Sequence, residues 1–541
     1  MNLQHASSPR TIWVDAICIN QSDLVERGEQ VQLMRQIYQK AATVFVFLGP
    51  SWAGLDLAVG FFEAAAAYPE FHYDPQHEPC LEVQGHNASS RELRKNLIRL
   101  LTLRWWTRLW TAQEYVLARQ VKFQCGRTIL DGKVAQTAYD NLRRHENTCC
   151  WDCPVVSQDD EFGIPLLHAF FQMDATESAR GTSGGHQVAG ELGTPASFAM
   201  TLDRDQNLKD AWASTALTSF LSVLDDFRAR DCSDAKDKIY GLTGLYYSDD
   251  VAAEFSKPDY SLPVEQLYTD LVHTMIRMTG RLDVLSRARG YCEPNLDLPS
   301  FVPDWSVGFA VNIDRVARLV GYDASGGRKA DWAVVDAHTV RTRAILLDEL
   351  AEFGDEVGGD AAIEGTLKSW ASLAGFDWEQ SSFADRSGVF SKSSSFWHTL
   401  CGDILTYRVL GCLITSRIDR EEPQDRAEEV VYSSYLDWYD YVTNIFMHGT
   451  RRTTNVIDFQ SAFDRMTTLK RFAVTRDGRY GFFPEKARCG DVLALLPGGN
   501  EPFVLRLGLD GTYEVLGVGY IHGIMLGEAF DETRLETIHL A

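Results

Sequence analysis

Two short apolar runs that flank one helical segment constrain the fold of this chain most strongly. The first run covers residues 11–19, and the second covers residues 43–50 and ends in a Gly-Pro pair. Between them, Asp23 and Glu26 form a start that resembles a capping box, and apolar side chains then recur at helical spacing up to residue 41. A strand, a helix and a strand with short connections form a βαβ unit, whose two strands are parallel.

The same kind of pattern continues through about the first 130 residues. Helical patterns cover residues 55–67 and 90–103, a further helix carries Trp110 and Glu114, and a strand follows at residues 121–125. We therefore predict an open α/β sheet with parallel strands for this region. In such sheets, polar side chains at the carboxyl ends of the strands form the functional sites.

The remainder of the chain divides by composition into five segments. Residues 131–153 form a connecting segment, and residues 154–212 are rich in Gly, Ser, Thr and Ala, which is typical of a flexible insertion or linker. Residues 213–330 are predicted to be mainly helical with an extended Pro-rich part, and residues 331–460 mix strands and helices. Short alternating runs separated by Asp-Gly and Gly-Gly-Asn turns predict a small antiparallel β unit at residues 465–541.

Charge and composition exclude some classes of partner. The chain has 541 residues, a net charge of −23 and a pI near 5.0, so neither nucleic acid nor an anionic membrane surface is an expected partner. No apolar run approaches the roughly 18 residues that a membrane span needs, and the N-terminus lacks the pattern of a secretory signal. Eleven scattered cysteines indicate reduced thiols rather than a disulfide framework. We expect a cytoplasmic protein.

Several segments resemble a known family. "WVDAICINQ", "VFVFLGP" and "RLWTAQE" occur in the order found in the heterokaryon incompatibility (HET) domain of fungal proteins, and residues 1–130 are identified as such a domain. "DAKDKIYGLTGL", "KPDYS", "VPDWS" and "GYIHGIMLGEA" look like segments that follow this domain in many family members.

The resemblance implies a role in fungal non-self recognition that leads to programmed cell death. It also implies protein partners that bind through the HET domain, including other copies of the chain. HET domains are held to be distantly similar to the Toll/interleukin-1 receptor (TIR) fold, so a flavodoxin-like parallel sheet is expected at the N-terminus. Family members usually begin with an earlier strand of the type Tyr-x-Ala-Leu-Ser-Tyr-x-Trp-Gly. Only residues 2–6 stand in its place, so we expect the first strand to be missing, either through a short gene model or in a truncated member that regulates its full-length relatives.

Glu114 is the candidate catalytic residue that the resemblance implies. Some TIR domains cleave the nicotinamide–ribose bond of NAD with a glutamate in a Trp-Cys-x-x-Glu pattern. Trp110 and Glu114 have the same spacing, with Thr111 in the place of the cysteine. A carboxylate can stabilise the positive charge that develops during glycosidic cleavage.

The polar residues that follow the first apolar run are the candidate substrate contacts. Asp15, Asn20 and Gln21 would bind the substrate together with Trp110, and NAD would be that substrate, with no cofactor expected. The alternative is that Glu114 is a structural carboxylate that holds Arg108 or the loop beside Asn20, and that Asp15 and Asn20 only satisfy loop backbone and cap the next helix.

Other groups of polar residues favour structural roles. Cys150 and Cys153 have zinc-like spacing, but a second Cys-x-x-Cys is absent, so no metal site is predicted. Asp237 and Lys238 are interpreted as a charged surface turn, and His522 as a hydrogen-bonded residue of a sheet rather than a ligand.

Overall fold

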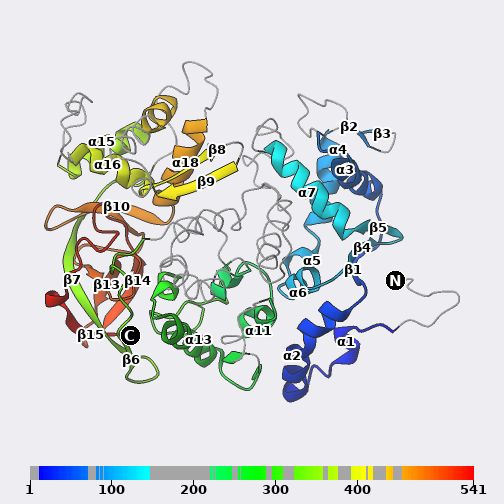
Figure 1. The fold of residues 1–541 in the computed structure, drawn as a ribbon, viewed down its shortest axis with the longest axis horizontal. Coiled ribbons are helices and arrows are strands. Elements are labelled where there is room, and N and C mark those ends of the chain that lie inside the picture. The colour runs from blue at the N-terminus through cyan, green and yellow to red at the C-terminus, as the bar shows by residue number, and fades with distance from the viewer. Residues whose placement is uncertain are drawn as a thin grey trace. The chain divides into compact units, whose positions relative to one another are not determined.

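The structure is a computed structural model, and its described residues divide into two compact units (Figure 1). The N-terminal unit contains the described residues up to 146 and those between 220 and 263, and the C-terminal unit contains those from Val264 onward. The described ranges are 11–70, 81–83, 86–88, 90–146, 220–221, 223–225, 227–245, 254–255, 257–287, 295–308, 322–357, 363–375, 392–409, 412–417, 434–442 and 454–541. The predicted insertion at 154–212, the cysteine pair at 150 and 153 and the start of the chain lie outside them.

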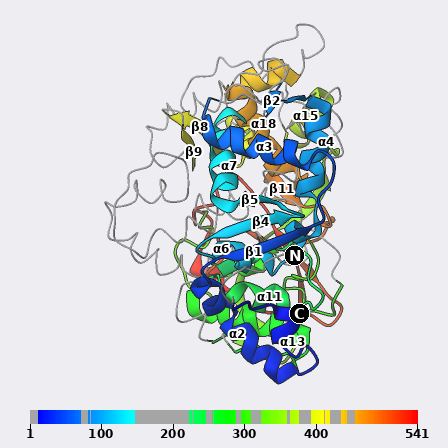
Figure 2. The same cartoon turned by 90° about the vertical axis from the view of Figure 1, so that its right-hand side faces the viewer.

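A three-stranded sheet forms the centre of the N-terminal unit (Figure 2). Strand β1 (Val44–Gly49) runs parallel to β4 (Val121–Cys125), and β5 (Thr128–Asp131) pairs antiparallel with β4, in the order β1-β4-β5. The predicted α/β character is therefore confirmed, and a parallel pair is present, although it joins β1 to β4 rather than residues 11–19 to residues 43–50. The turn from β4 to β5 passes through Gly126 at φ 59°, a conformation that favours glycine.

Helices α3, α4 and α5 bury apolar side chains in the core of the N-terminal unit. Buried side chains from α3, α4, α5 and β4 meet there, among them Phe62, Leu97, Trp106 and Phe123. The helices of the unit are α1 (Asp15–Cys18), α2 (Leu24–Lys40), α3 (Leu55–Ala67), α4 (Ser90–Leu101), α5 (Arg104–Thr107), α6 (Thr111–Val116), α7 (Gly132–Glu146) and α11 (Asp237–Thr243). A small hairpin of β2 (Leu81–Val83) and β3 (His86–Ala88) precedes α4.

The predicted strand at residues 11–19 is wrong. Residues 11–14 pair with no strand among the described residues, and Asp15–Cys18 form the single turn of α1, whose Ile17 and Cys18 amides donate to the Val14 carbonyl. Trp13 instead packs edge-on against Tyr38 of α2, with ring centroids 5.9 Å apart. A short apolar run forms a strand only when a neighbouring strand pairs with it, and here a helix is the neighbour.

Helix α2 confirms the predicted helix at residues 23–41. The Asp23 side chain accepts hydrogen bonds from the Val25 and Glu26 amides, as a helix N-cap does. The Glu26 carboxylate in turn accepts from the backbone amide of Asn20 at 3.0 Å, three residues before the cap. The loop that contains Asn20 is therefore fixed to the start of α2.

The C-terminal unit is built on an eight-stranded, mainly antiparallel sheet, which confirms the predicted β-rich C-terminus. The strand order is β11-β10-β7-β12-β13-β14-β15, with β6 beside β7, and β15 also pairs with β7 so that part of the sheet closes on itself. The strands are β6 (Trp332–Val334), β7 (Val340–Phe353), β10 (Lys470–Thr475), β11 (Tyr480–Pro484), β12 (Val492–Leu495), β13 (Phe503–Leu507), β14 (Tyr513–Val518) and β15 (Glu536–Leu540). Strand β7 is long enough to pair with four others.

An aromatic core joins this sheet to the helices of the unit. Trp370 stacks on Phe472 with ring centroids 5.1 Å apart, and Trp438, Phe463 and Phe482 surround the pair. The remaining elements are α13 (Val264–Thr279), η2 (Asp283–Arg287), α15 (Ile363–Leu373), α16 (Lys392–Cys401), β8 (Ile404–Val409), β9 (Cys412–Arg417), α18 (Thr454–Thr467) and η4 (Glu532–Arg534). Among the described residues, no helix is both long and apolar enough to cross a membrane.

Candidate functional site

Helix α6, which carries the Trp110–Glu114 motif, is hydrogen-bonded to two other helices of the N-terminal unit, α5 and α11. Trp110 precedes the first residue of the helix, and its Nε1 donates to Asp237 Oδ2 at 3.1 Å. Gln113 is buried and its Nε2 donates to the Gly241 carbonyl at 2.7 Å. Glu114 Oε2 accepts from Trp105 Nε1 at 2.8 Å. The motif therefore directs its polar atoms to different partners rather than into one pocket.

Asp237 lies at the centre of a buried polar cluster, and its own side chain is 3% exposed. Tyr260 donates its hydroxyl to Asp237 Oδ1 at 2.7 Å, and Arg27 Nη2 donates to the same oxygen at 3.1 Å. The Arg27 guanidinium also pairs with Asp234 at 3.3 Å and lies 3.7 Å from the centroid of the Tyr260 ring. We call Arg27, Trp110, Asp234, Asp237 and Tyr260 the Asp237 cluster.

The Asp237 cluster brings together segments that are far apart in the sequence. Arg27 belongs to α2, Trp110 to the start of α6, Asp237 to α11 and Tyr260 to the "KPDYS" segment. Burial raises the pKa of Asp237, and the hydrogen bond from Tyr260 and the charge of Arg27 act in the opposite direction. A buried carboxylate requires such partners, because an unpaired charge in the interior is costly.

The predicted surface turn at Asp237 and Lys238 is wrong, because both residues are buried. Lys238 Nζ donates to the Arg228 carbonyl at 2.6 Å and also to the Arg230 carbonyl, and burial lowers the pKa of its amine. The two charges point to different partners and do not pair with each other in the described contacts. Local spacing could not reveal this contact, because Arg27, the partner of Asp237, lies 210 residues earlier.

Glu114 lies in a second, smaller group of polar side chains. Burial raises the pKa of its carboxyl group, while the hydrogen bond from Trp105 and the charge of Arg108 lower it. The charge of Asp15 raises it further, so Asp15 is near enough to interact with Glu114. Tyr38 of α2 responds to both carboxylates, and its pKa is raised mainly by burial. The structure thus brings Asp15 and Glu114 into one neighbourhood.

Asn20 and Gln21 have exposed side chains near the start of α2. The Asn20 side-chain oxygen accepts from the Ser22 amide at 3.2 Å, which is a local loop contact. The described part of the chain contains no hydrogen bond between either side chain and Glu114. The structure therefore groups Asp15 with Glu114, places Trp110 in the Asp237 cluster, and leaves Asn20 and Gln21 in the loop before α2.

Two small residues of α11 and its end permit the close packing on α6. A Cβ at Gly241 would lie 3.2 Å from Leu109 Cδ2, and a Cβ at Gly244 would lie 2.8 Å from Gln113 Nε2. The "GLTGL" segment is therefore a packing surface for α6 and the residues before it.

The two ends of the chain each match a known family model. Residues 1–114 match the family model described as "Heterokaryon incompatibility protein (HET)", and residues 421–541 match the "Het-6 beta-barrel domain".

A named relative is similar along almost the whole chain. The chain is 23% identical to "Heterokaryon incompatibility protein 6, OR allele" of Neurospora crassa over 601 aligned residues, which cover 98% of this chain and 83% of the relative. No solved structure matches the chain significantly. The resemblance to the HET family is confirmed, and the similarity to the TIR fold stays a prediction.

Proposed function

We propose that this chain acts in fungal vegetative incompatibility, as an effector or signalling protein that promotes programmed cell death on non-self recognition. The observation that carries the proposal is the alignment with a heterokaryon incompatibility protein over 98% of this chain and 83% of the relative. The presence of a HET match and a Het-6 β-barrel match in one chain supports it.

The contacts of α6 indicate how much of the chain this function requires. The HET match ends at residue 114, yet Trp110 and Gln113 bind Asp237 and Gly241, which lie beyond it. Arg27, near the start of the match, binds Asp237 as well. We infer that the working module includes α11 and Tyr260, and that residues 1–114 alone lack buried partners for these polar groups.

Inducible expression in a filamentous fungus tests the proposal. The wild-type chain is expected to arrest growth and to admit a vital dye into the cells. Arg27→Gln removes the cation of the Asp237 cluster and should abolish or strongly reduce this effect. Glu29→Gln changes an exposed charge on the same helix and should kill as the wild type does. Normal growth of cells that accumulate the wild-type chain would contradict the proposal.

A second candidate activity is cleavage of NAD by Glu114. The observation that favours it is a partly buried carboxyl group that is held by Trp105 and lies within reach of the charge of Asp15. Nicotinamide leaves NAD as a neutral molecule without taking up a proton, so Glu114 would act as a carboxylate that stabilises the positive charge developing on the ribose. Among the predicted substrate contacts, Asp15 is the residue whose charge acts on Glu114. Trp110 is hydrogen-bonded to Asp237, and Asn20 and Gln21 lie in the loop before α2.

Incubation of the purified full-length chain with NAD tests the enzyme against the alternative, a binding module that self-associates or binds other proteins. Glu114→Gln keeps an oxygen that can accept from Trp105, so the variant should fold. Release of nicotinamide that is lost in Glu114→Gln and kept in Glu29→Gln supports the enzyme. Absence of turnover together with preserved killing supports the binding module.

A further inference from the structure

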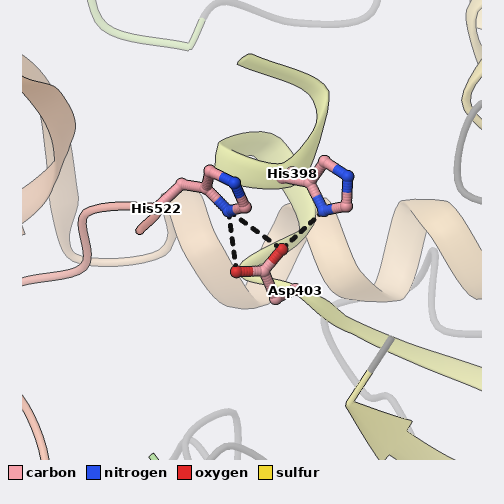
Figure 3. A group of neighbouring side chains, drawn as sticks. All are labelled: His398, Asp403 and His522. Atoms are coloured by element: carbon pink, nitrogen blue, oxygen red, sulfur yellow. Dashed lines mark hydrogen bonds and ion pairs between the residues drawn. The ribbon is translucent and has the colours of Figure 1, made fainter. Parts of the chain in front are cut away.

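A cluster of His398, Asp403 and His522 lies in the C-terminal unit, separate from the contacts of the HET domain (Figure 3). His398 belongs to α16, Asp403 lies in the turn between α16 and β8, and His522 follows β14. His398 Nδ1 lies 2.6 Å from Asp403 Oδ1, and His522 Nδ1 lies 2.9 Å from Oδ2. One ligand atom from each residue can be chosen so that all three atoms lie within 4.8 Å of one another.

The cluster is largely shielded from water. The side chains of Asp403, His398 and His522 are 4%, 10% and 18% exposed, respectively. The two imidazole rings stack with centroids 4.7 Å apart and planes inclined by 29°. In Figure 3 both rings turn the same nitrogen, Nδ1, toward the carboxylate, so the three side chains converge on one point.

The conformation of the turn fixes the carboxylate at this point. Asp403 has a φ of 57°, in the left-handed region that residues other than glycine seldom adopt. Gly402, which precedes it, has a φ of 67°. The Tyr322 hydroxyl donates to the Gly402 carbonyl, and the Tyr520 hydroxyl donates to Asp403 Oδ2. Hydrogen bonds of this kind orient the ligands of metal sites.

The charge of Asp403 needs compensation in this environment. The Asp403 side chain is almost fully buried, and its two oxygens face the Nδ1 atoms of both histidines at hydrogen-bond distance. Two neutral imidazoles supply no countercharge, and protonation of both would place two positive charges on stacked rings. A divalent cation among the same three atoms supplies the countercharge without that repulsion.

We propose that His398, Asp403 and His522 bind a divalent first-row transition metal. Two imidazole nitrogens and one carboxylate oxygen are a donor set that such ions accept, with zinc the first probe. A neutral imidazole carries its single proton on either nitrogen. Binding through Nδ1 therefore requires only that each ring proton moves to Nε2 and that the metal replaces the hydrogen bonds to Asp403.

His522 is far from the other two residues of the cluster in the sequence, so no sequence motif indicates that the three meet. His522 lies inside the matched range 421–541, while His398 and Asp403 precede it. The separation of 119 residues between Asp403 and His522 leaves no local spacing that a motif could show. The expectation that His522 is only a hydrogen-bonded sheet residue accounts for its contact with Asp403 but not for the convergence of the second histidine.

Isothermal titration of the purified full-length chain with zinc chloride tests the proposal. It is performed in a Cys150→Ser/Cys153→Ser background, because this cysteine pair has zinc-like spacing. We expect one zinc ion per chain, and His398→Gln and His522→Gln should each weaken binding by at least about tenfold. His539→Gln alters an exposed histidine of β15 and should leave the affinity unchanged.

A cobalt titration of the same background chain covers the case in which the histidine variants do not fold. Cobalt bound by imidazole and carboxylate should show visible d–d bands without a thiolate-to-metal charge-transfer band in the near ultraviolet. Absence of zinc binding in the background chain, a thiolate band, or equal losses in His539→Gln and His522→Gln would each overturn the proposal.

Discussion

The two units each contain a buried aspartate, but the two aspartates have different partners. Asp237 in the N-terminal unit is paired with Arg27, whose charge is permanent. Asp403 in the C-terminal unit is paired with two histidines, whose imidazole nitrogens are also metal ligands. A tyrosine hydroxyl donates to each carboxylate. Asp237 therefore has a fixed cation as its partner, whereas the nitrogens beside Asp403 can bind a metal ion in place of their hydrogen bonds to the carboxylate.

The largest expected effect is the loss of the Asp237 carboxylate. Asp237→Ala leaves Arg27, Trp110 and Tyr260 without their common acceptor, and removal of one partner from a buried ion pair costs about 3–5 kcal/mol. Hydrogen exchange of peptides that cover α6 and α11 should show the loss in the N-terminal unit. Peptides of β12 and β13 in the C-terminal unit serve as the internal control. Unchanged protection of α6 would show that the cluster does not stabilise the unit.

A pair of helical glycines gives the next largest effect, with opposite signs in the two units. A Cβ at Gly28 of α2 would lie 2.5 Å from the Pro258 carbonyl oxygen, so Gly28→Ala should destabilise the N-terminal unit by about 1–3 kcal/mol. Gly365 of α15 has nothing within 4 Å of the same position. Gly365→Ala should therefore stabilise its helix by about 0.5–1 kcal/mol.

Chemical unfolding of both glycine variants, followed unit by unit through hydrogen exchange, measures the difference. If Gly28→Ala stabilises α2 as strongly as Gly365→Ala stabilises α15, the tight contact between α2 and the "KPDYS" segment is not formed.

The two tyrosine hydroxyls are expected to give effects comparable with that of Gly28→Ala. Tyr260→Phe and Tyr520→Phe each remove one donor to a carboxylate, which costs about 1.5–3 kcal/mol for a hydrogen bond to a charged group. Since Asp237 still pairs with Arg27 in Tyr260→Phe, this variant should lose less stability in the N-terminal unit than Asp237→Ala does. Tyr520→Phe should leave the stoichiometry of zinc at one ion per chain, and a loss of stoichiometry would place the hydroxyl among the ligands.

Regular elements with strong local patterns were predictable from the sequence, and contacts between distant segments were not. The predicted helix at 55–67 and strand at 121–125 have the same bounds as α3 and β4, since periodicity and turn residues determine them locally. The strand at 11–19 failed because strand formation depends on a partner. The Trp110–Glu114 spacing identified the right helix, but Arg27 and Tyr260 meet Asp237 only in the fold. For the same reason the sequence did not group His522 with Asp403.

The pH dependence of stability tests the contrast between the two carboxylates most directly. The depressed pKa of Asp403 contributes stability above the ordinary pKa of an unfolded aspartate, near about 3.9, and this stability is lost as the pH falls through the folded value. The raised pKa of Asp237 has the opposite sign, because its contribution is largest below the unfolded pKa and decreases as the pH rises through the folded value.

The decisive measurement is the hydrogen-exchange stability of each unit between pH 7 and pH 3, in the metal-free wild-type chain and in Asp403→Asn and Asp237→Asn. The difference between wild type and Asp403→Asn in the C-terminal unit should shrink on acidification. The difference between wild type and Asp237→Asn in the N-terminal unit should widen over the same range. Two differences that change in the same direction would contradict the account of one fixed and one exchangeable cluster.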